Sequence, residues 1–422
     1  MGAKKFSVDN IQKAVCHFKQ QQSPLFLPFR LLSIILQAIC SHLASAFIKT
    51  ANDSGRIVVG FSNIYYNGNP RAVFEYMQSH PEKYDIFWCA KNMRTLKEVN
   101  KAGGKAFFVN GLLGLPYFLR ADAWVVAHHG FGNIPLAKNS DCIKIMLWHG
   151  AGYKGHQRER NPSFYSHYDA WCTSSDWARE RHISLWNAPP EKIHGTGYPR
   201  LDRLHPYLRN PGIKRSDVLR QLGLPPGAKI VLYAPTLGEK LWPWGEDEYR
   251  GFEAFCNFCG ERGVHVVLRL HYYAHRTLDL HKIRDILKHQ PNVSMLNMDR
   301  KPDTEKILAI ADVLVCGWSS IATDFLATRR PIVYINLNKQ RYTDEAKGEG
   351  LVPPHIRPGE TAETETEFYE KLDISLLKNR FLDEQEKALG KIHGLVDGQA
   401  SMRVARLIEH LVARKFNKQI AL

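Results

Sequence analysis

Apolar and polar positions follow two alternating patterns from residue 56 onward. Short β-branched apolar runs, typical of buried strands, are separated by longer stretches whose apolar positions recur with helical spacing. The first series of predicted strands covers residues 57–61, 85–89, 106–109, 123–127 and 142–148. The second series covers residues 229–233, 264–270, 293–296, 312–316 and 332–335. This alternation predicts an α/β fold in which parallel sheets are covered by helices.

The two series of strands predict two domains. Residues 205–216, with the sequence HPYLRNPGIKRS, have the Pro, Gly and polar composition of a linker. We therefore expect two doubly wound, Rossmann-like domains, 51–205 and 217–380, that face each other across a cleft. Helical periodicity in 383–416, with Val404 and Leu411 on one apolar face, predicts C-terminal helices over 381–422. Ligands of open parallel sheets bind at the carboxyl ends of the strands, so candidate residues are sought there.

The first 50 residues have a different pattern. Four lysines precede an apolar run at 25–48 that is interrupted by Arg30, Gln37 and His42, among others. A membrane-spanning helix needs about 20 predominantly apolar residues, so these interruptions favour an amphipathic helix instead. Such a helix either packs on the body of the protein or lies in a membrane interface with its basic neighbours. A signal peptide ending at 44–46 is the alternative, although its start would be unusually long.

Charge and cysteine usage narrow the class of protein. The 422 residues include 57 Lys and Arg against 42 Asp and Glu, a net charge of +15, which favours an anionic partner. Nucleic acid, an acidic membrane and a polyanionic product all fit that charge, but the chain has no Lys/Arg runs or RNA-binding signature, which argues against nucleic acid. The eight cysteines are spread through predicted strands and helices, as buried intracellular thiols are. Cys256 and Cys259 form a single CxxC, without the second pair that a zinc site needs.

A candidate anion site follows the strand at 312–316. The turn Gly317-Trp318 precedes a helix predicted to open at Ser319-Ser320, to continue through Leu326 and to end at Pro331. A helix N-terminus offers unpaired N–H groups and a positive dipole end to a phosphate. Asp324, four residues after Ser320, shares its face and is predicted to reach toward a ribose hydroxyl. The alternative is an ordinary strand-helix junction with a capping serine.

A candidate general base follows the strand at 142–148. His149 precedes the glycine-rich turn 150–155, which formally matches GxGxxG. The dinucleotide fingerprint also needs a long helix and an acidic residue about 20 positions on, and Pro162 cuts that helix short. With dinucleotide binding set aside, the feature that remains is a histidine at the end of a predicted strand, His149, with Lys154 nearby. An imidazole, whose unperturbed pKa lies near 6.5, is suited to proton abstraction, and the alternative is a structural histidine at the turn.

Four further motifs lie where the pattern ends a strand or opens a helix. They contribute Gly197, Pro199 and Arg200 in HGTGYPRLDRL, Thr236 in VLYAPT, Arg269 and His271 in VVLRLHYYAH, and Ser401 and Arg403 in DGQASMR. His271 and His275 have i,i+4 spacing but follow a strand, so no metal pair is expected there. Side chains rich in His, Arg, Ser and Thr at successive strand ends predict a cleft for a phosphorylated ligand.

The ordered motifs resemble those of the CDP-glycerol glycerophosphotransferases of teichoic-acid and capsule synthesis, which have the GT-B fold. LWHGAGYK resembles the family's WHG-x-x-x-K block and TGYPRLD its G-x-P-R-x-D block. VLYAPT, LRLH, ADVLVCGWSSIATDF with RRPIVY, and DGQASMR resemble later blocks in the same order. The resemblance covers roughly residues 140–405.

The resemblance implies a function and a role for each matching residue. It implies transfer of a polyol phosphate, most readily glycerol phosphate, from a CDP-activated donor to a hydroxyl of a glycan or lipid-linked acceptor, with release of CMP. His149 then matches the base. The residues matched to diphosphate contacts are Thr236, Ser319, Ser320 and His271, and His271 is also a catalytic candidate. Asp324 matches a residue near the ribose, and Arg269 and Arg403 lie in blocks assigned to donor binding. Lys154 and Arg200 lie on the acceptor side or in the cleft.

The expected reaction and the N-terminal segment also predict the surroundings of the reaction. No cofactor or metal is expected, because N–H groups and cations hold the donor and the chain has no Asp-x-Asp motif. The expected location is cytoplasmic, peripheral on the inner face of an anionic cell membrane. Acceptor identity, single addition or polymerisation, and oligomeric state stay open.

Three departures from the family pattern leave the transferred group open. Cys316-Gly317-Trp318 stands in place of Thr-Asp-Tyr, Leu237 in place of an aromatic residue, and Tyr272 in place of a proline. Two other functions remain as alternatives. One is a GT-B glycosyltransferase that uses a nucleotide sugar, and the other is a non-catalytic, membrane-associated binding protein for anionic glycans.

Overall fold

The computed structural model describes residues 55–109, 111–128, 141–154, 162–236, 238–271, 274–296, 303–337 and 350–416. The predicted amphipathic segment 25–48 and the departures at Leu237 and Tyr272 lie outside the described residues. Among the described residues, no helix is both long and apolar enough to cross a bilayer.

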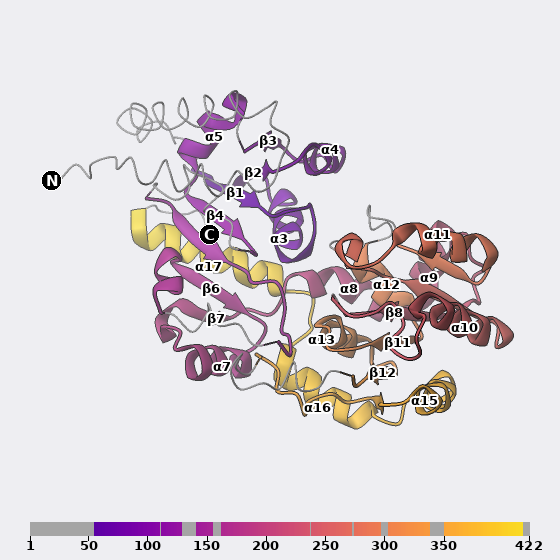
Figure 1. Cartoon of the computed structure of the whole chain (residues 1–422). Coiled ribbons are helices and arrows are strands. Elements are labelled where there is room, and N and C mark those ends of the chain that lie inside the picture. The colour runs from indigo at the N-terminus through magenta and orange to yellow at the C-terminus, as the bar shows by residue number, and fades with distance from the viewer. Residues whose placement is uncertain are drawn as a thin grey trace.

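The first unit is built on a seven-stranded parallel sheet with the order β3-β2-β1-β4-β5-β6-β7 (Figure 1). Its strands are β1 Ile57–Ser62, β2 Tyr84–Ala90, β3 Ala106–Phe108, β4 Ala123–Val126, β5 Ile143–Met146, β6 Ala170–Thr173 and β7 Ile193–Gly195. All six residues of β1 are buried, as expected for a parallel strand covered on both faces. The helices α3 Gly68–Gln78 and α4 Met93–Lys101 cover one face, and α5 Leu115–Arg120 and α7 Asp176–Trp186 cover the other. Short 3₁₀ turns lie between the strands and helices of this unit at Leu112–Gly114, Pro162–His167 and Pro190–Lys192.

The second unit is built on a six-stranded parallel sheet with the order β10-β9-β8-β11-β12-β13. Its strands are β8 Lys229–Ala234, β9 Val264–Leu268, β10 Val293–Met295, β11 Val313–Cys316, β12 Ile332–Ile335 and β13 Glu360–Ala362. One face carries α10 Glu248–Glu261, α11 Leu280–His289 and α15 Glu365–Leu377, and the other carries α12 Thr304–Ile310 and α13 Ile321–Phe325. Cys256 and Cys259 lie in the core under α10, where burial raises the pKa of Cys259 to about 12. The CxxC is therefore a pair of core thiols.

The segment predicted as a linker is helical. Residues 205–216 fall in α8 Arg200–Arg209 and α9 Pro211–Gln221, which are separated by Asn210. The composition was misleading because Pro211 occupies the first turn of α9, where its missing N–H costs nothing. Both helices pack against α12, so the connection between the sheets is packed structure rather than free chain.

The chain returns to the first unit at its C-terminal end. After α16 Leu382–His393 on the second unit, α17 Ala400–Phe416 crosses back and runs beside β5 and α3 (Figure 1). Val404 and Val412 are fully buried in the core of the first unit, as the helical periodicity predicted, while Leu411 packs at its margin. One apolar cluster contains side chains from both sheets, so the two units share a packed contact.

The predicted α/β class and the two doubly wound sheets are confirmed, and every predicted strand is present within one or two residues. The strands β6, β7 and β13 were not predicted. In each sheet the strand order reverses beside one strand pair, β1 and β4 in the first and β8 and β11 in the second. Ligands of open α/β sheets bind outside the carboxyl ends of such pairs.

Candidate active site

A cavity of about 560 Å³ lies between the two units. Residues at the carboxyl ends of strands from both sheets line it, together with the first turns of α3, α8 and α12. Of the residues predicted from the sequence, it brings together His149, Arg200, Arg269, His271, Ser319, Ser320 and Asp324. The rule that ligands of open parallel sheets bind at the carboxyl ends of the strands therefore placed most of the candidate residues at this cavity.

The turn that carries His149 departs from ordinary backbone geometry. Trp148 has a left-handed φ of 55° and Gly150 has a φ of 154°. A side chain on Gly150 would place its Cβ 3.1 Å from Nη2 of Arg200 and 3.6 Å from Oγ of Ser320. Glycine at this position therefore leaves room for the guanidinium of Arg200 beside the turn.

Two polar residues of the first unit that the sequence reasoning missed hold this turn. Asn69, buried at the start of α3, donates to the carbonyl oxygens of Trp148 at 2.9 Å and Leu147 at 3.2 Å. Its own Oδ1 accepts from the backbone N–H of Arg200 at 3.1 Å. The ring of His128, at the end of β4, stacks on His149 with centroids 4.9 Å apart.

His128 is held in turn by a residue at the end of β1. Its Nδ1 lies 3.0 Å from Oδ1 of Asn63, and Asn63 donates from Nδ2 to the carbonyl and side-chain oxygens of Asn67. The signals were present in the sequence. Asn67-Gly68-Asn69 lies between a strand and a helix, and His128 directly follows the predicted strand 123–127.

Arg200 joins the two walls of the cavity. Its guanidinium donates from Nη1 to the carbonyl oxygen of His149 at 2.5 Å and from Nη2 to Oδ1 of Asp324 at 2.7 Å. The residue is only 9% exposed, and Asp324 is 8% exposed. One buried side chain thus links the turn of the candidate base in the first unit to the helix behind Ser320 in the second.

Asp324 has a second neighbour, His393 at the end of α16. Burial lowers the pKa of His393 to about 4, so its ring is neutral near pH 7. Its Nε2 donates to the carbonyl oxygen of Thr323 at 3.0 Å and lies 3.9 Å from Oδ1 of Asp324. The counter-charge of Asp324 is therefore Arg200. The contact of Asp324 with a ribose hydroxyl stays a prediction. The carboxylate that would make this contact already accepts a hydrogen bond from Arg200.

The helix after Ser319-Ser320 is shorter than predicted. α13 spans only Ile321–Phe325, continues as a 3₁₀ turn and ends at Arg329, which has a left-handed φ of 57°. The predicted end at Pro331 was wrong because the backbone reverses two residues earlier. Neither serine lies in the first turn: Ser320 precedes it and makes no side-chain cap, and Ser319 Oγ accepts from the N–H of Ile321 at 3.4 Å. Such a short helix contributes little dipole, so the two hydroxyls and nearby cations are the main groups for an anion.

Gly317 and Trp318, two of the positions that depart from the family pattern, are buried. Neither residue lines the cavity. A Cβ on Gly317 would lie 2.5 Å from Oγ1 of Thr236, which accepts from the N–H of Trp318 at 3.0 Å. Trp318 is buried, donates from its indole to the carbonyl of Leu337 and packs under the guanidinium of Arg357, 4.0 Å from its ring. These two departures therefore change the packing beneath the Ser319-Ser320 turn, and they do not change the residues that line the cavity.

Three predicted residues do not line this cavity. Thr236 supports the turn of Trp318, as described above. Lys154 is exposed beyond the wall. Arg403 donates to the carbonyl of Thr196 at 2.7 Å and pairs with Asp397 at 2.8 Å. Their contacts with a donor or acceptor stay predictions, whereas the turn at Gly197 has the left-handed φ of 80° expected of a tight turn.

An ion-pair network closes one side of the cavity and was not predicted. Asp303, directly before α12, accepts from Arg71 at 3.0 Å and from Arg203 at 2.7 Å. Glu75 of α3 pairs with the same two arginines at 2.7 and 2.8 Å. Because Asp303 belongs to the second unit and its partners to the first and to α8, the network fixes the spacing of the two cavity walls. The two pairs with Asp303 join residues 232 and 100 positions apart, so they have no local signal in the sequence.

The arrangement places the imidazole of His149 in the same cavity as cations and hydroxyls of the second unit. Arg269 reaches Oγ1 of Thr304 at 3.4 Å beside His271, at the carboxyl end of β9. No group of three or more metal-ligating side chains occurs in the described part of the chain. A base facing groups that bind phosphate is suited to transferring a phosphoryl group to a hydroxyl.

Comparisons with known proteins agree with this chemistry. A family model described as CDP-Glycerol:Poly(glycerophosphate) glycerophosphotransferase matches residues 44–410. The teichoic acid glycerol-phosphate transferase of Staphylococcus aureus (strain NCTC 8325 / PS 47) is 23% identical over 380 residues, 82% of this chain and 91% of that protein. The teichoic acid poly(glycerol phosphate) polymerase of Bacillus spizizenii (strain ATCC 23059 / NRRL B-14472 / W23) is 24% identical over 352 residues, 78% and 84% of the two chains.

A solved structure is similar over nearly the whole length. The wall teichoic acid polymerase TagF has a TM-score of 0.68 at 19% identity, covering 98% of this chain and 100% of that one. A variant of TagF soaked with CDPG gives 0.69, with the same identity and coverage. At such identity the likeness shows a shared fold.

Proposed function

The chain belongs to the CDP-glycerol:poly(glycerophosphate) glycerophosphotransferase family, and from that premise we propose how its cavity performs the transfer. The fold is GT-B, and the enzyme is a glycerophosphotransferase. We propose that it moves glycerol phosphate from CDP-glycerol to a hydroxyl of a teichoic-acid type acceptor and releases CMP. The observation that carries this proposal is that His149 of the first unit and Arg269, His271 and Ser319 of the second unit line one cavity between the two units.

In the proposed reaction His149 acts on the acceptor. Its imidazole takes the hydroxyl proton as the acceptor oxygen bonds to the β-phosphorus of CDP-glycerol. The bond from that phosphorus to the oxygen bridging the two phosphates breaks, and CMP leaves with the electron pair. The stacked ring of His128 supports this role by fixing the plane of His149, and Arg200 supports it by holding the carbonyl of the turn.

The second unit stabilises the charge that builds up on the leaving group. Arg269, His271 and the hydroxyls of Ser319 and Ser320 line the part of the cavity that the second unit contributes. Preorganised donors aimed at developing charge are worth several kcal/mol in a site that excludes water. In this proposal the protein's own cations do this work, with no metal or cofactor.

The direct test is product analysis with purified protein. We expect mass spectrometry to show an acceptor heavier by one or more glycerol phosphate units after incubation with CDP-glycerol, and CMP in equal amount. The rate should change by less than about twofold in excess EDTA, because side-chain cations replace a metal in charge stabilisation. Complete loss with EDTA, restored by a divalent metal, would contradict the metal-free proposal. Product formed only from nucleotide sugars would contradict the donor.

We also propose that the protein is peripheral on the cytoplasmic face of an anionic membrane. The support is sequence: lysines at 4, 5, 13 and 19 precede the apolar segment 25–48, the pattern of an interfacial helix with basic neighbours. A protein lacking residues 1–50 is expected to stay in the supernatant when sedimented with anionic liposomes, whereas the full chain pellets. Equal pelleting of both proteins would refute the role of this segment.

A further inference from the structure

The helix α4 carries a basic face beside the cavity. Arg94, Lys97 and Lys101 have i, i+3 and i+7 spacing and so lie on one side of the helix. Lys97 and Lys101 are exposed, and in the described part of the chain neither has an ion-pair partner. Arg94 is held by Glu98 at 3.0 Å and lies 5.3 Å over the ring of Tyr65. This face therefore presents unneutralised positive charge.

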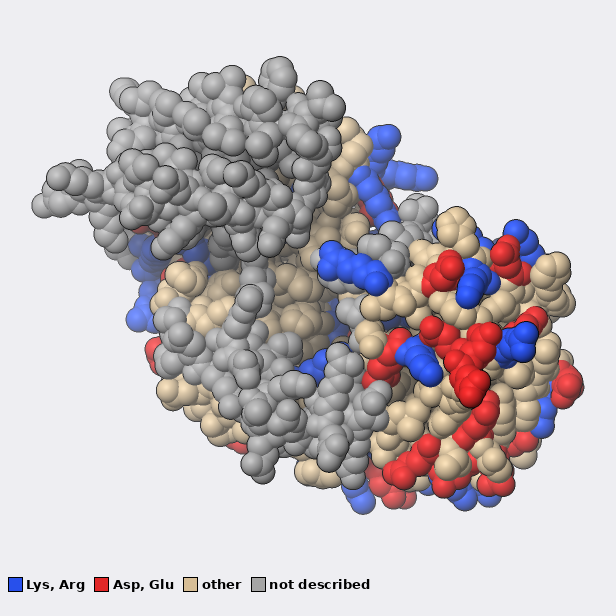
Figure 2. All heavy atoms as spheres, in the orientation of Figure 1, with Lys and Arg blue, Asp and Glu red and all other residues tan. Residues whose placement is uncertain are grey.

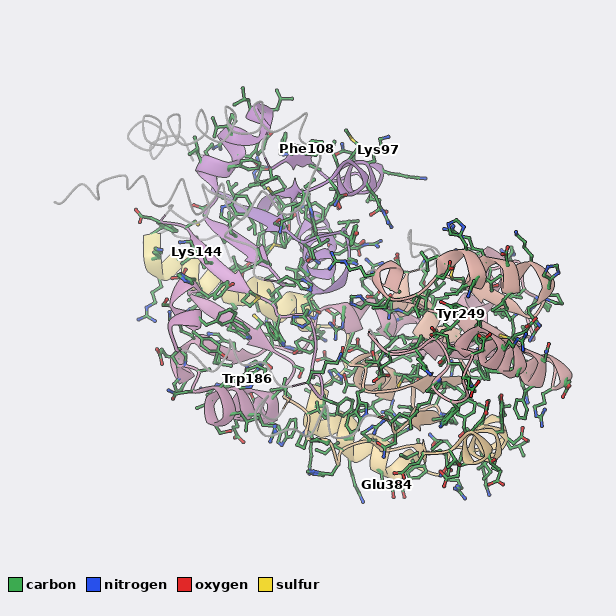
Figure 3. All side chains as sticks on the ribbon, in the orientation of Figure 1. Lys97, Phe108, Lys144, Trp186, Tyr249 and Glu384 are labelled. Atoms are coloured by element: carbon green, nitrogen blue, oxygen red, sulfur yellow. The ribbon has the colours of Figure 1, made fainter. Side chains whose placement is uncertain are left out.

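The basic face is continuous with the active site. Tyr65, Arg94, Glu98 and Lys101 line the same cavity as His149, and α12 adds Lys306 from the second unit. Figure 2 shows basic side chains at the edge of the first unit nearest α4, whereas many acidic side chains gather on this face of the second unit. Figure 3 places Lys97 on α4 at that edge. The cavity thus continues from the candidate base along α4.

The strand order fixes the spacing between this face and His149. α4 follows β2, which is three strands from β5 in the order β2-β1-β4-β5. Adjacent strands lie about 4.8 Å apart, so the start of α4 is about 14 Å along the sheet edge from the His149 turn. α4 is itself about 13 Å long, at 1.5 Å per residue, and Lys101 lies at its C-terminal end. A ligand that reaches both His149 and Lys101 is a chain rather than a single polyol.

The acceptor is the ligand that must lie on this side. Its reactive hydroxyl meets His149 of the first unit, while the donor diphosphate faces Arg269, His271 and Ser319 of the second. The rest of an acceptor chain then leaves the site over the first unit. Side chains on one helix face recur about every 5–6 Å, so Lys97 and Lys101 offer two positive charges one turn apart to a polymer with repeated negative charge.

We propose that the basic face of α4 is a binding subsite for the phosphodiester groups of the acceptor chain. This inference rests on the proposed function and narrows its acceptor to one that already bears several phosphates behind its reactive hydroxyl. A flat lipid surface fits less well, because Arg94 and Lys101 line a cavity between the two units. The subsite makes a polyanionic acceptor a better substrate than a neutral one.

The test compares two acceptors and two pairs of lysines. K97Q/K101Q removes the charge from two exposed side chains while keeping helix propensity. The matched control is K387Q/K391Q, which removes two exposed lysines with the same i,i+4 spacing from α16. With an acceptor that carries several phosphodiester units, K97Q/K101Q should raise the acceptor KM roughly tenfold. With a matched acceptor that carries none, its KM should change by less than about twofold, and so should the KM for CDP-glycerol. The control should match wild type throughout.

Salt gives a second readout. Added NaCl should raise the KM of the wild type for the polyanionic acceptor and have a weaker effect on K97Q/K101Q, because exposed charge pairs are screened. An equal KM change for both acceptors, or none for either, would overturn the subsite. Loss of binding to anionic liposomes with unchanged kinetics would overturn it in favour of a membrane contact. If the wild type transfers nothing from CDP-glycerol to either acceptor, the proposed function itself fails, an outcome distinct from these.

Discussion

His149→Ala is expected to lower kcat by roughly 10²- to 10⁴-fold while the protein stays folded and binds its nucleotide. General base catalysis contributes about that factor, and alanine removes the imidazole that takes the acceptor proton in the proposed reaction. In the proposed reaction the donor binds mainly against the second unit, so the KM for CDP-glycerol should stay within about threefold of wild type. Steady-state kinetics with both substrates measures the split between kcat and KM.

Two controls separate loss of the base from loss of the fold. His281→Ala removes an exposed histidine of α11, remote from the cavity, and should leave kcat unchanged. CDP-glycerol at about 100 times its dissociation constant should stabilise His149→Ala and wild type alike, by about 2.7 kcal/mol in thermal unfolding. Added imidazole should restore part of the lost rate. Full turnover by His149→Ala would show that another group is the base.

The sequence predicted the parts of the site that local pattern controls. His149, Arg269 and His271 follow apolar runs long enough to be recognised as strands, and parallel strands bring their carboxyl ends to one edge. Ser319 and Ser320 were placed at the cavity for the same reason. The helix behind them was predicted too long, because Arg329 adopts a left-handed conformation that an arginine seldom takes and that sequence does not signal.

The contacts between the two units could not be predicted. Arg200 and Asp324 are 124 residues apart, and Arg203 and Asp303 are 100 apart, so no periodicity or spacing connects them. The same limit applies to Trp318, whose departure from the family pattern suggested an altered donor wall. Only the packing shows that its indole lies beneath the turn, against Arg357. Donor identity is therefore less affected by this departure than the sequence indicated.

Loss of the Arg200 guanidinium is expected to damage stability and turnover by separable routes. Arg200→Ala leaves Asp324 buried without its counter-charge, which should cost about 3–5 kcal/mol of unfolding free energy. It also frees the carbonyl of His149, and a displacement of about 1 Å at a catalytic group lowers the rate by about 10²-fold. Arg200→Lys should recover only part of either loss, because one ammonium cannot donate along both directions of the guanidinium.

The double variant R200A/D324N distinguishes the two routes, because asparagine removes the unpaired charge without restoring the bond to the His149 turn. We expect it to regain much of the unfolding free energy lost in Arg200→Ala, measured by urea denaturation, while kcat stays about 10²-fold low. Asp324→Asn alone reports on any contact of this residue with the donor through the KM for CDP-glycerol. Recovery of stability and turnover together in the double variant would mean that Arg200 only neutralises a buried carboxylate. Recovery of stability alone identifies Arg200 as the positioning residue that holds the base in the first unit in register with the phosphate-binding turn in the second.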